Sequence, residues 1–91
     1  MVMRAIVTVI GKDRVGIIAK VCSLLAESGV NILDISQTIL QEYLTMIMLV
    51  DISGCTTSFV ELSKILETRG VEQSLSIRIQ REDIFEAMHR I

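Results

Sequence analysis

The order in which hydrophobic periodicity changes along the chain constrains its fold more than any other feature. Apolar and β-branched residues run almost unbroken from Met3 to Ile10, which predicts a strand in the middle of a sheet. Between about residues 15 and 28 the apolar spacing becomes three and four, which predicts a helix that ends at Gly29 as a left-handed cap. Residues 30–40 alternate and residues 44–52 are Met- and Leu-rich, so two strands should follow.

The same order of helix and strand patterns repeats in the second half of the chain. Ser58 and Glu61 have the spacing of a capping box and predict the start of a second helix, which should close at Gly70 as another left-handed cap. The clean alternation over residues 71–80 predicts a fourth strand. A short amphipathic helix is expected over residues 82–91, because apolar residues recur there at helical spacing: Ile84, Phe85, Met88 and Ile91.

These elements predict one α+β domain with the ferredoxin-like βαββαβ plan, in which a four-stranded antiparallel sheet carries both helices on one face. The core should span residues 3–81, with the short C-terminal helix added to it. Residues 30–40 should form a half-exposed edge strand, and residues 71–80 the other edge. This fold hosts many unrelated activities, so function has to be argued from particular residues.

Composition predicts a homodimer. A domain of 91 residues is marginal as a monomer, yet 51% of its residues are apolar and only 22% are charged. More apolar side chains are present than a two-layer core of this size can hide, and a second subunit would bury the surplus.

Charge and residue types exclude several functions. The net charge is −2 and the Arg and Lys residues are scattered, so no basic patch is expected to bind nucleic acid. The central strands also lack the aromatic residues with which an RNA-recognition module stacks bases. Cys22 and Cys55 form no redox or metal motif, so we expect neither metal nor cofactor. The absence of a signal peptide and of a long apolar run predicts a cytoplasmic protein that does not enter a membrane.

The best candidate for a site is the junction from Val9 to Ile18, where a strand gives way to a polar turn with a glycine at each end and then to a helix. A helix N-terminus presents unsatisfied N–H donors and a partial positive charge, which suit a ligand carboxylate. Structural roles compete with this interpretation: Asp13 is expected to be the helix N-cap, Gly16 can serve helix packing, and Asn31 can satisfy a turn.

No catalytic residue is predicted. His89 is the only histidine and lies on an expected surface helix, and no nucleophile constellation occurs. One enzymatic alternative stays open, an acylphosphatase-like hydrolase whose first loop cradles phosphate with help from Arg14 and Asn31. Asp13 opposes it, because a carboxylate in the cradle repels phosphate.

Residues 11–32 resemble the ACT domain family. The segments Gly11-Lys12-Asp13-Arg14-Val15-Gly16-Ile17-Ile18, Lys20-Val21, Leu24-Leu25-Ala26 and Gly29-Val30-Asn31-Ile32 are similar to the family pattern D-R-x-G-I-x-x-x-V-x-x-x-L-A-x-x-G-x-N-I. Val15 stands where many members carry proline, which should loosen the turn.

The resemblance implies a regulatory sensor of an amino acid or similar small molecule, paired side by side so that two sheets form one of eight strands. It implies a ligand near the first loop, against the neighbouring subunit. The ligand-binding residues carried over are Gly11, Asp13, Arg14, Val15, Gly16, Ile17, Asn31 and Ile32.

The length resembles that of small stand-alone bacterial ACT proteins, which are similar to the halves of the glycine-cleavage transcriptional repressor. This likeness implies control of a partner protein, such as an enzyme or a transcription regulator. The alternative within the family is a ligand-free module that only dimerises or assembles.

Overall fold

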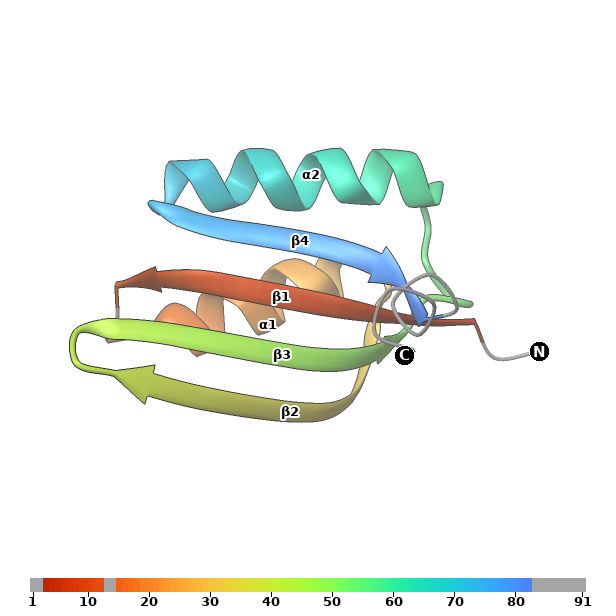
Figure 1. Cartoon of the computed structure of the whole chain (residues 1–91). Coiled ribbons are helices and arrows are strands. Elements are labelled where there is room, and N and C mark those ends of the chain that lie inside the picture. The colour runs from red at the N-terminus through yellow and green to blue at the C-terminus, as the bar shows by residue number, and fades with distance from the viewer. Residues whose placement is uncertain (1–2, 13–14, 83–91) are drawn as a thin grey trace.

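The computed structural model describes residues 3–12 and 15–82. Its elements are β1 (Arg4–Lys12), α1 (Ile17–Glu27), β2 (Asn31–Leu40), β3 (Tyr43–Asp51), α2 (Phe59–Glu72) and β4 (Leu75–Arg81). The strands pair antiparallel in the order β2-β3-β1-β4, and both helices cover one face of the sheet (Figure 1). The α+β ferredoxin-like prediction is confirmed, with β1 inside the sheet and β2 and β4 at its edges. The helix predicted over residues 82–91 lies, apart from Glu82, outside the described residues.

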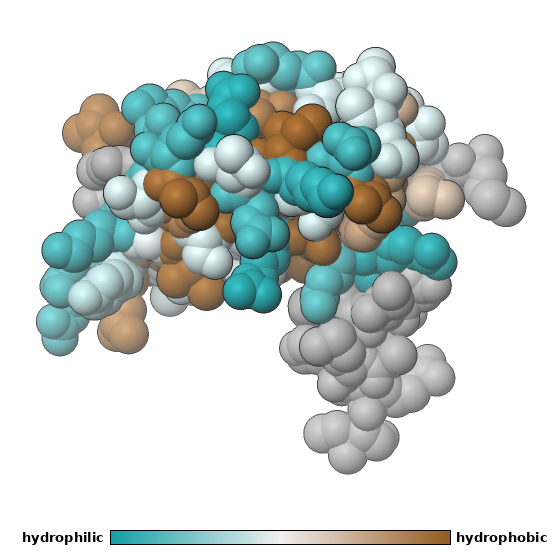
Figure 2. Space-filling model, turned by 90° about the horizontal axis from the view of Figure 1, so that it is seen from above, coloured by the Kyte–Doolittle hydropathy of each residue, from teal (hydrophilic) through white to brown (hydrophobic). Residues whose placement is uncertain are grey.

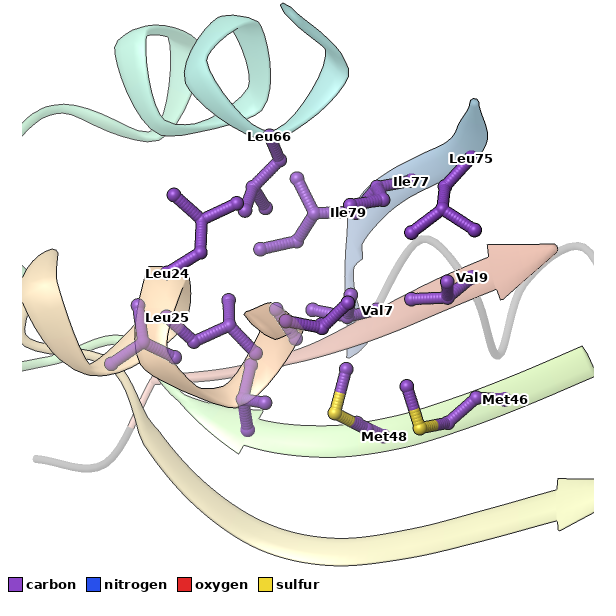
Figure 3. Close-up of a cluster of buried hydrophobic side chains, with 14 of the residues drawn as sticks. Val7, Val9, Leu24, Leu25, Met46, Met48, Leu66, Leu75, Ile77 and Ile79 are labelled. Atoms are coloured by element: carbon purple, nitrogen blue, oxygen red, sulfur yellow. The ribbon is translucent and has the colours of Figure 1, made fainter. Parts of the chain in front are cut away.

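The core lies between the sheet and the helices. Alternate residues of β1 and β3 are fully buried on the helix side, among them Val7, Val9, Met46 and Met48. Figure 3 shows them beneath side chains from α1, α2 and β4. The alternation arises because successive strand residues point to opposite faces of a sheet.

The end of α1 agrees with the sequence prediction. Gly29 has a φ of +78°, its N–H donates to the Ala26 carbonyl at 3.0 Å, and the Val30 N–H donates to the Leu25 carbonyl at 3.0 Å. This is a Schellman motif, in which the last helical carbonyls are satisfied by the turn that follows. A Cβ at Gly29 would lie 2.6 Å from the Gly54 carbonyl oxygen, so the position also requires glycine for space.

The start of α2 is as predicted, but its end is not. Ser58 is the N-cap, and its Oγ accepts a hydrogen bond from the Glu61 N–H at 3.2 Å. The prediction that Gly70 ends the helix is wrong: the helix continues through Glu72, and the left-handed position is taken by Ser74, with a φ of +59°. Gly70 instead allows close packing, because a Cβ there would lie 3.0 Å from the Leu75 carbonyl oxygen. The fourth strand therefore starts at Leu75 rather than at residue 71.

Strand β2 is more exposed than the predicted half-exposed edge. Its register shifts between Ile32 and Asp34, and none of its residues is fully buried. Ile35 and Ile39 pair with Met48 and Leu44, so they point to the helix side of the sheet, yet both remain exposed. Four large hydrophobic side chains are exposed on this strand: Leu33, Ile35, Ile39 and Leu40.

Candidate functional site

Gly11 belongs to the sheet, one residue before the end of β1. It pairs with Leu44 on β3 and with Leu75 on β4. A Cβ at this position would collide with the Leu75 side chain, and the Ser74 carbonyl oxygen would lie 3.3 Å away. Gly11 is therefore explained by the close approach of β4.

Gly16 is the N-cap of α1, which corrects the prediction that Asp13 holds this position. Its φ of +88° is in the left-handed region, and its carbonyl accepts the Lys20 N–H at 3.0 Å. Asp13 and Arg14 lie outside the described residues. The chain needs glycine here because other residues rarely adopt this conformation.

The first turn of α1 has no counter-charge of its own in the described part of the chain. Gly16 has no side chain to cap the first N–H groups, and no acidic residue lies in the first turn. A Cβ added to Gly16 would meet nothing within 4 Å, so the space beside it is open. Unsatisfied donors and the positive end of the helix dipole thus face an accessible space, which suits an anionic group.

Two neighbours of Gly16 have opposite roles. The Val15 side chain is fully exposed and available for contact, whereas Ile17 is buried and anchors the helix start to the core. A ligand at this junction would touch Val15 and the backbone around Gly16 rather than the Ile17 side chain.

The structure separates Asn31 and Ile32 from this junction. Asn31 pairs with Asp51, which pairs with Arg4 at the start of β1, whereas the junction follows Lys12 at the end of β1. Eight strand steps of about 3.4 Å put the two ends of β1 about 27 Å apart. Asn31 is exposed, while Ile32 is half-buried against the core. One chain alone therefore does not bring the predicted site together. The separation also opposes the hydrolase alternative, which requires Asn31 beside the loop of its own chain.

Other chemistry has little support among residues 3–12 and 15–82. No group of three His, Cys, Asp or Glu residues there could hold a metal ion. Cys22 and Cys55 are free and half-buried. A hydrogen bond from the Ser53 N–H lowers the pKa of Asp51 below its ordinary value, which is explained by a local turn. Within the same described part, no helix has the length and apolar character needed to cross a bilayer.

The structure reveals one feature that sequence reasoning missed, a cleft of about 370 Å³ between α1 and α2. None of the predicted ligand-binding residues lines it. Helical spacing alone places three of its residues on one face of α1: Lys20, Ser23 and Glu27. The opposite side is formed by Arg69 and Gln73, in and directly after α2, which is far along the chain, so the cleft could not be read from the sequence.

Fold and junction together define a small ferredoxin-like domain with an open helix start. Residues 4–80 match the ACT domain family, and the chain belongs to that family. ACT domains are generally regulatory modules that bind small molecules.

Two of the relatives match nearly the whole length of the chain. A UPF0237 protein of Clostridium acetobutylicum is 57% identical over 89 residues, covering 98% of this chain and 100% of that protein. An ACT domain protein from Streptococcus pneumoniae has 46% identity and a TM-score of 0.82, covering 98% of this chain and 100% of the other. A putative glycine cleavage system transcriptional repressor is 25% identical with a TM-score of 0.76, and the match covers 89% of this chain but 46% of that one.

Proposed function

We propose that this protein is a non-catalytic regulatory module that binds an amino acid between two identical subunits and thereby controls a partner protein. The observation that carries the proposal is the open start of α1, where Gly16 leaves the first N–H groups without a side-chain cap. The α-carboxylate of an amino acid is an anion that can accept hydrogen bonds from such donors. ACT domains generally bind small molecules, and an amino acid belongs to that broader class.

A second copy of the chain would complete the site. If β2 pairs antiparallel with β2 of the partner subunit about a two-fold axis, strand direction is inverted across the interface. Asn31 of the partner subunit then lies near Leu40 of the first chain, at the end of the sheet where β1 leads into Gly16. The Asn31 amide oxygen can accept from the ammonium group of the ligand.

The β2 edge favours this pairing. It exposes Ile35, Ile39 and Leu40, the last with 72% of its surface accessible, and it carries no lysine or arginine to deter another strand. The surface seen from the α2 side instead mixes hydrophobic with hydrophilic residues (Figure 2). Pairing through β2 would extend the sheet to eight strands and cover the exposed apolar residues.

The proposal includes regulation through a partner in the cytoplasm. A ligand held by both subunits stabilises the dimer, and an enzyme or transcription regulator that recognises the dimer would respond to the ligand. The similarity to a putative glycine cleavage system transcriptional repressor supports a regulatory role.

Thermal unfolding in the presence of each of the twenty amino acids tests ligand binding. We expect one or a few to raise the melting temperature, because a ligand at a hundred times its Kd adds about 2.7 kcal/mol to the stability of the folded dimer. Asn31→Ala should abolish the shift, whereas Thr38→Ala, at an exposed position on the same strand, should keep it. The absence of any shift would leave only the ligand-free assembly module.

Sedimentation tests the dimer. The wild-type chain should sediment as a dimer at micromolar concentration, and Ile35→Lys should give a monomer because it puts a charge into the β2 interface. Val60→Lys changes an exposed valine on α2 and should leave the dimer intact. A monomeric wild-type protein would contradict the proposal.

A further inference from the structure

The cleft between α1 and α2 is a candidate for a second small-molecule site. Its floor is apolar and formed by Val21, Leu24, Leu75 and Ile77, and its rim is polar and formed by Lys20, Ser23, Glu27, Arg69 and Gln73. Figure 3 shows Leu24 projecting from α1 and Ile77 from β4 into the layer between the two helices. An apolar floor with a few converging polar groups is the usual form of a ligand site.

The polar groups are unevenly distributed along this cleft. Lys20 Nζ donates to Gln73 Oε1 at 3.0 Å and so links α1 to the C-cap residue of α2. The two helices run antiparallel, so Arg69, one turn before Gln73, lies about 6 Å farther along the cleft than Lys20 and on its opposite side. Glu27 lies seven residues beyond Lys20 on α1, about 10 Å along the helix, and marks the end of the cleft beyond Arg69.

Arg69 is available to an anionic ligand. Its Nε lies 3.5 Å from Glu72 Oε1, in a pair whose side chains are both more than half exposed. Exposed pairs of this kind contribute little stability, so a carboxylate can replace Glu72 at small cost. An incoming carboxylate would gain charge-assisted hydrogen bonds from Lys20 and Arg69.

We propose that this cleft binds a small monocarboxylate with an aliphatic body, its acid group between Lys20 and Arg69 and its body against Val21, Leu24 and Ile77. The charges set the specificity. An α-ammonium group would stand next to two cations, so a 2-oxo acid should bind better than the corresponding amino acid. A second carboxylate would approach Glu27, so dicarboxylates should bind poorly.

This site is independent of the amino-acid site at the subunit interface, because the two share no residues. Proton–nitrogen NMR of the whole protein separates them. Titration with 4-methyl-2-oxopentanoate should give saturable shifts in the amide signals of residues 19–27 and 69–77. Leucine and succinate at the same concentration should shift these amides much less.

Variants test the role of the two cations. Lys20→Gln combined with Arg69→Gln should weaken binding of 4-methyl-2-oxopentanoate at least about tenfold, the loss expected for one charge-assisted hydrogen bond. Lys64→Gln removes an exposed lysine of α2 that does not line the cleft and should leave the affinity unchanged. Ala19→Phe keeps both charges but fills the cleft, and should also abolish binding.

The proposal fails if 4-methyl-2-oxopentanoate gives no saturable shift, or if its shifts are confined to residues 11–17 and 31–32. It also fails if leucine binds the cleft equally well, or if Lys64→Gln weakens binding as much as the double variant. Asn31→Ala keeps the two tests apart, because a melting-temperature shift caused by an amino acid in the cleft would persist in this variant.

Discussion

The two βαβ halves of the domain share a plan but treat their helix starts differently. In the second half, Ser58 caps α2 and Glu61 adds a negative charge to its first turn. In the first half, Gly16 takes the cap position of α1 and no acidic residue follows in the first turn. One helix start satisfies its own donors, and the other leaves them for something outside the helix.

The edge strands of the two halves also differ in how well they are protected from pairing with a further strand. β4 alternates buried and exposed residues and carries Arg78 and Arg81, which discourage pairing with a further strand. β2 has a register shift, no cationic residue and exposed isoleucines on its helix side. The β3–α2–β4 half therefore caps its own helix and carries cations on its edge strand, whereas the β1–α1–β2 half leaves both its helix start and its edge strand accessible.

The helix ends give the largest expected difference between the halves. α1 ends at Gly29, where a Cβ would lie 2.6 Å from the Gly54 carbonyl oxygen and φ is +78°. Gly29→Ala should therefore lower the free energy of unfolding by about 3 kcal/mol, through backbone strain together with overpacking. Urea denaturation measures this change, and a loss below about 1 kcal/mol would show that the loop yields easily.

The corresponding position after α2 should respond in the opposite sense. Ser74 adopts a φ of +59° with a side chain in place, and it is exposed. Ser74→Gly should raise stability by about 0.5 kcal/mol, because glycine reaches this conformation without the steric cost but loses more entropy on folding. Destabilisation by Ser74→Gly would mean that the serine side chain contributes to the turn.

Removal of the α2 cap should have a moderate effect. Ser58→Ala deletes the acceptor of the Glu61 N–H and should cost about 1 kcal/mol, measured by thermal or urea unfolding. Gly16→Ser offers α1 the same hydroxyl but should destabilise the protein, because a left-handed φ is unsuited to a capping serine. A stabilising Gly16→Ser would contradict the view that the start of α1 is held open by its backbone.

Much of the fold was predictable because it rests on local patterns. The apolar runs over β1 and β3 and the alternation over β4 predict strands, and the Ser58–Glu61 spacing predicts a helix start, since each of these signals lies within a few residues. The end of α1 was predictable for the same reason, because a glycine after a helical repeat favours a left-handed turn.

The sequence predictions were wrong where the role of a residue depends on a part of the chain that is distant in sequence. Gly70 resembled a helix cap, but its lack of a side chain is required by β4, which follows later in the sequence. Gly16, rather than the predicted Asp13, is the N-cap of α1, and the left-handed backbone conformation of Gly16 does not follow from composition. Asn31 was grouped with the junction by a family pattern, and only the strand register shows that it stands at the other end of the sheet.

The smallest expected effect concerns Asp51, at the end of β3. Its Oδ1 accepts the Ser53 N–H at 2.9 Å, and this hydrogen bond lowers the pKa of Asp51 in the folded protein below its ordinary value of 3.8. The stabilisation is therefore fully present above the unfolded pKa and is lost as pH falls through the lower folded pKa.

Asp51→Asn keeps an oxygen that can accept the same hydrogen bond but does not titrate. The variant should lose stability less steeply than the wild type as pH falls from roughly 5 to 2, because the linkage at this carboxylate is gone. Urea unfolding at several pH values measures the two slopes. Parallel curves would show that the pKa of Asp51 is the same in the folded and unfolded chain, so that this turn owes its stability to the backbone alone.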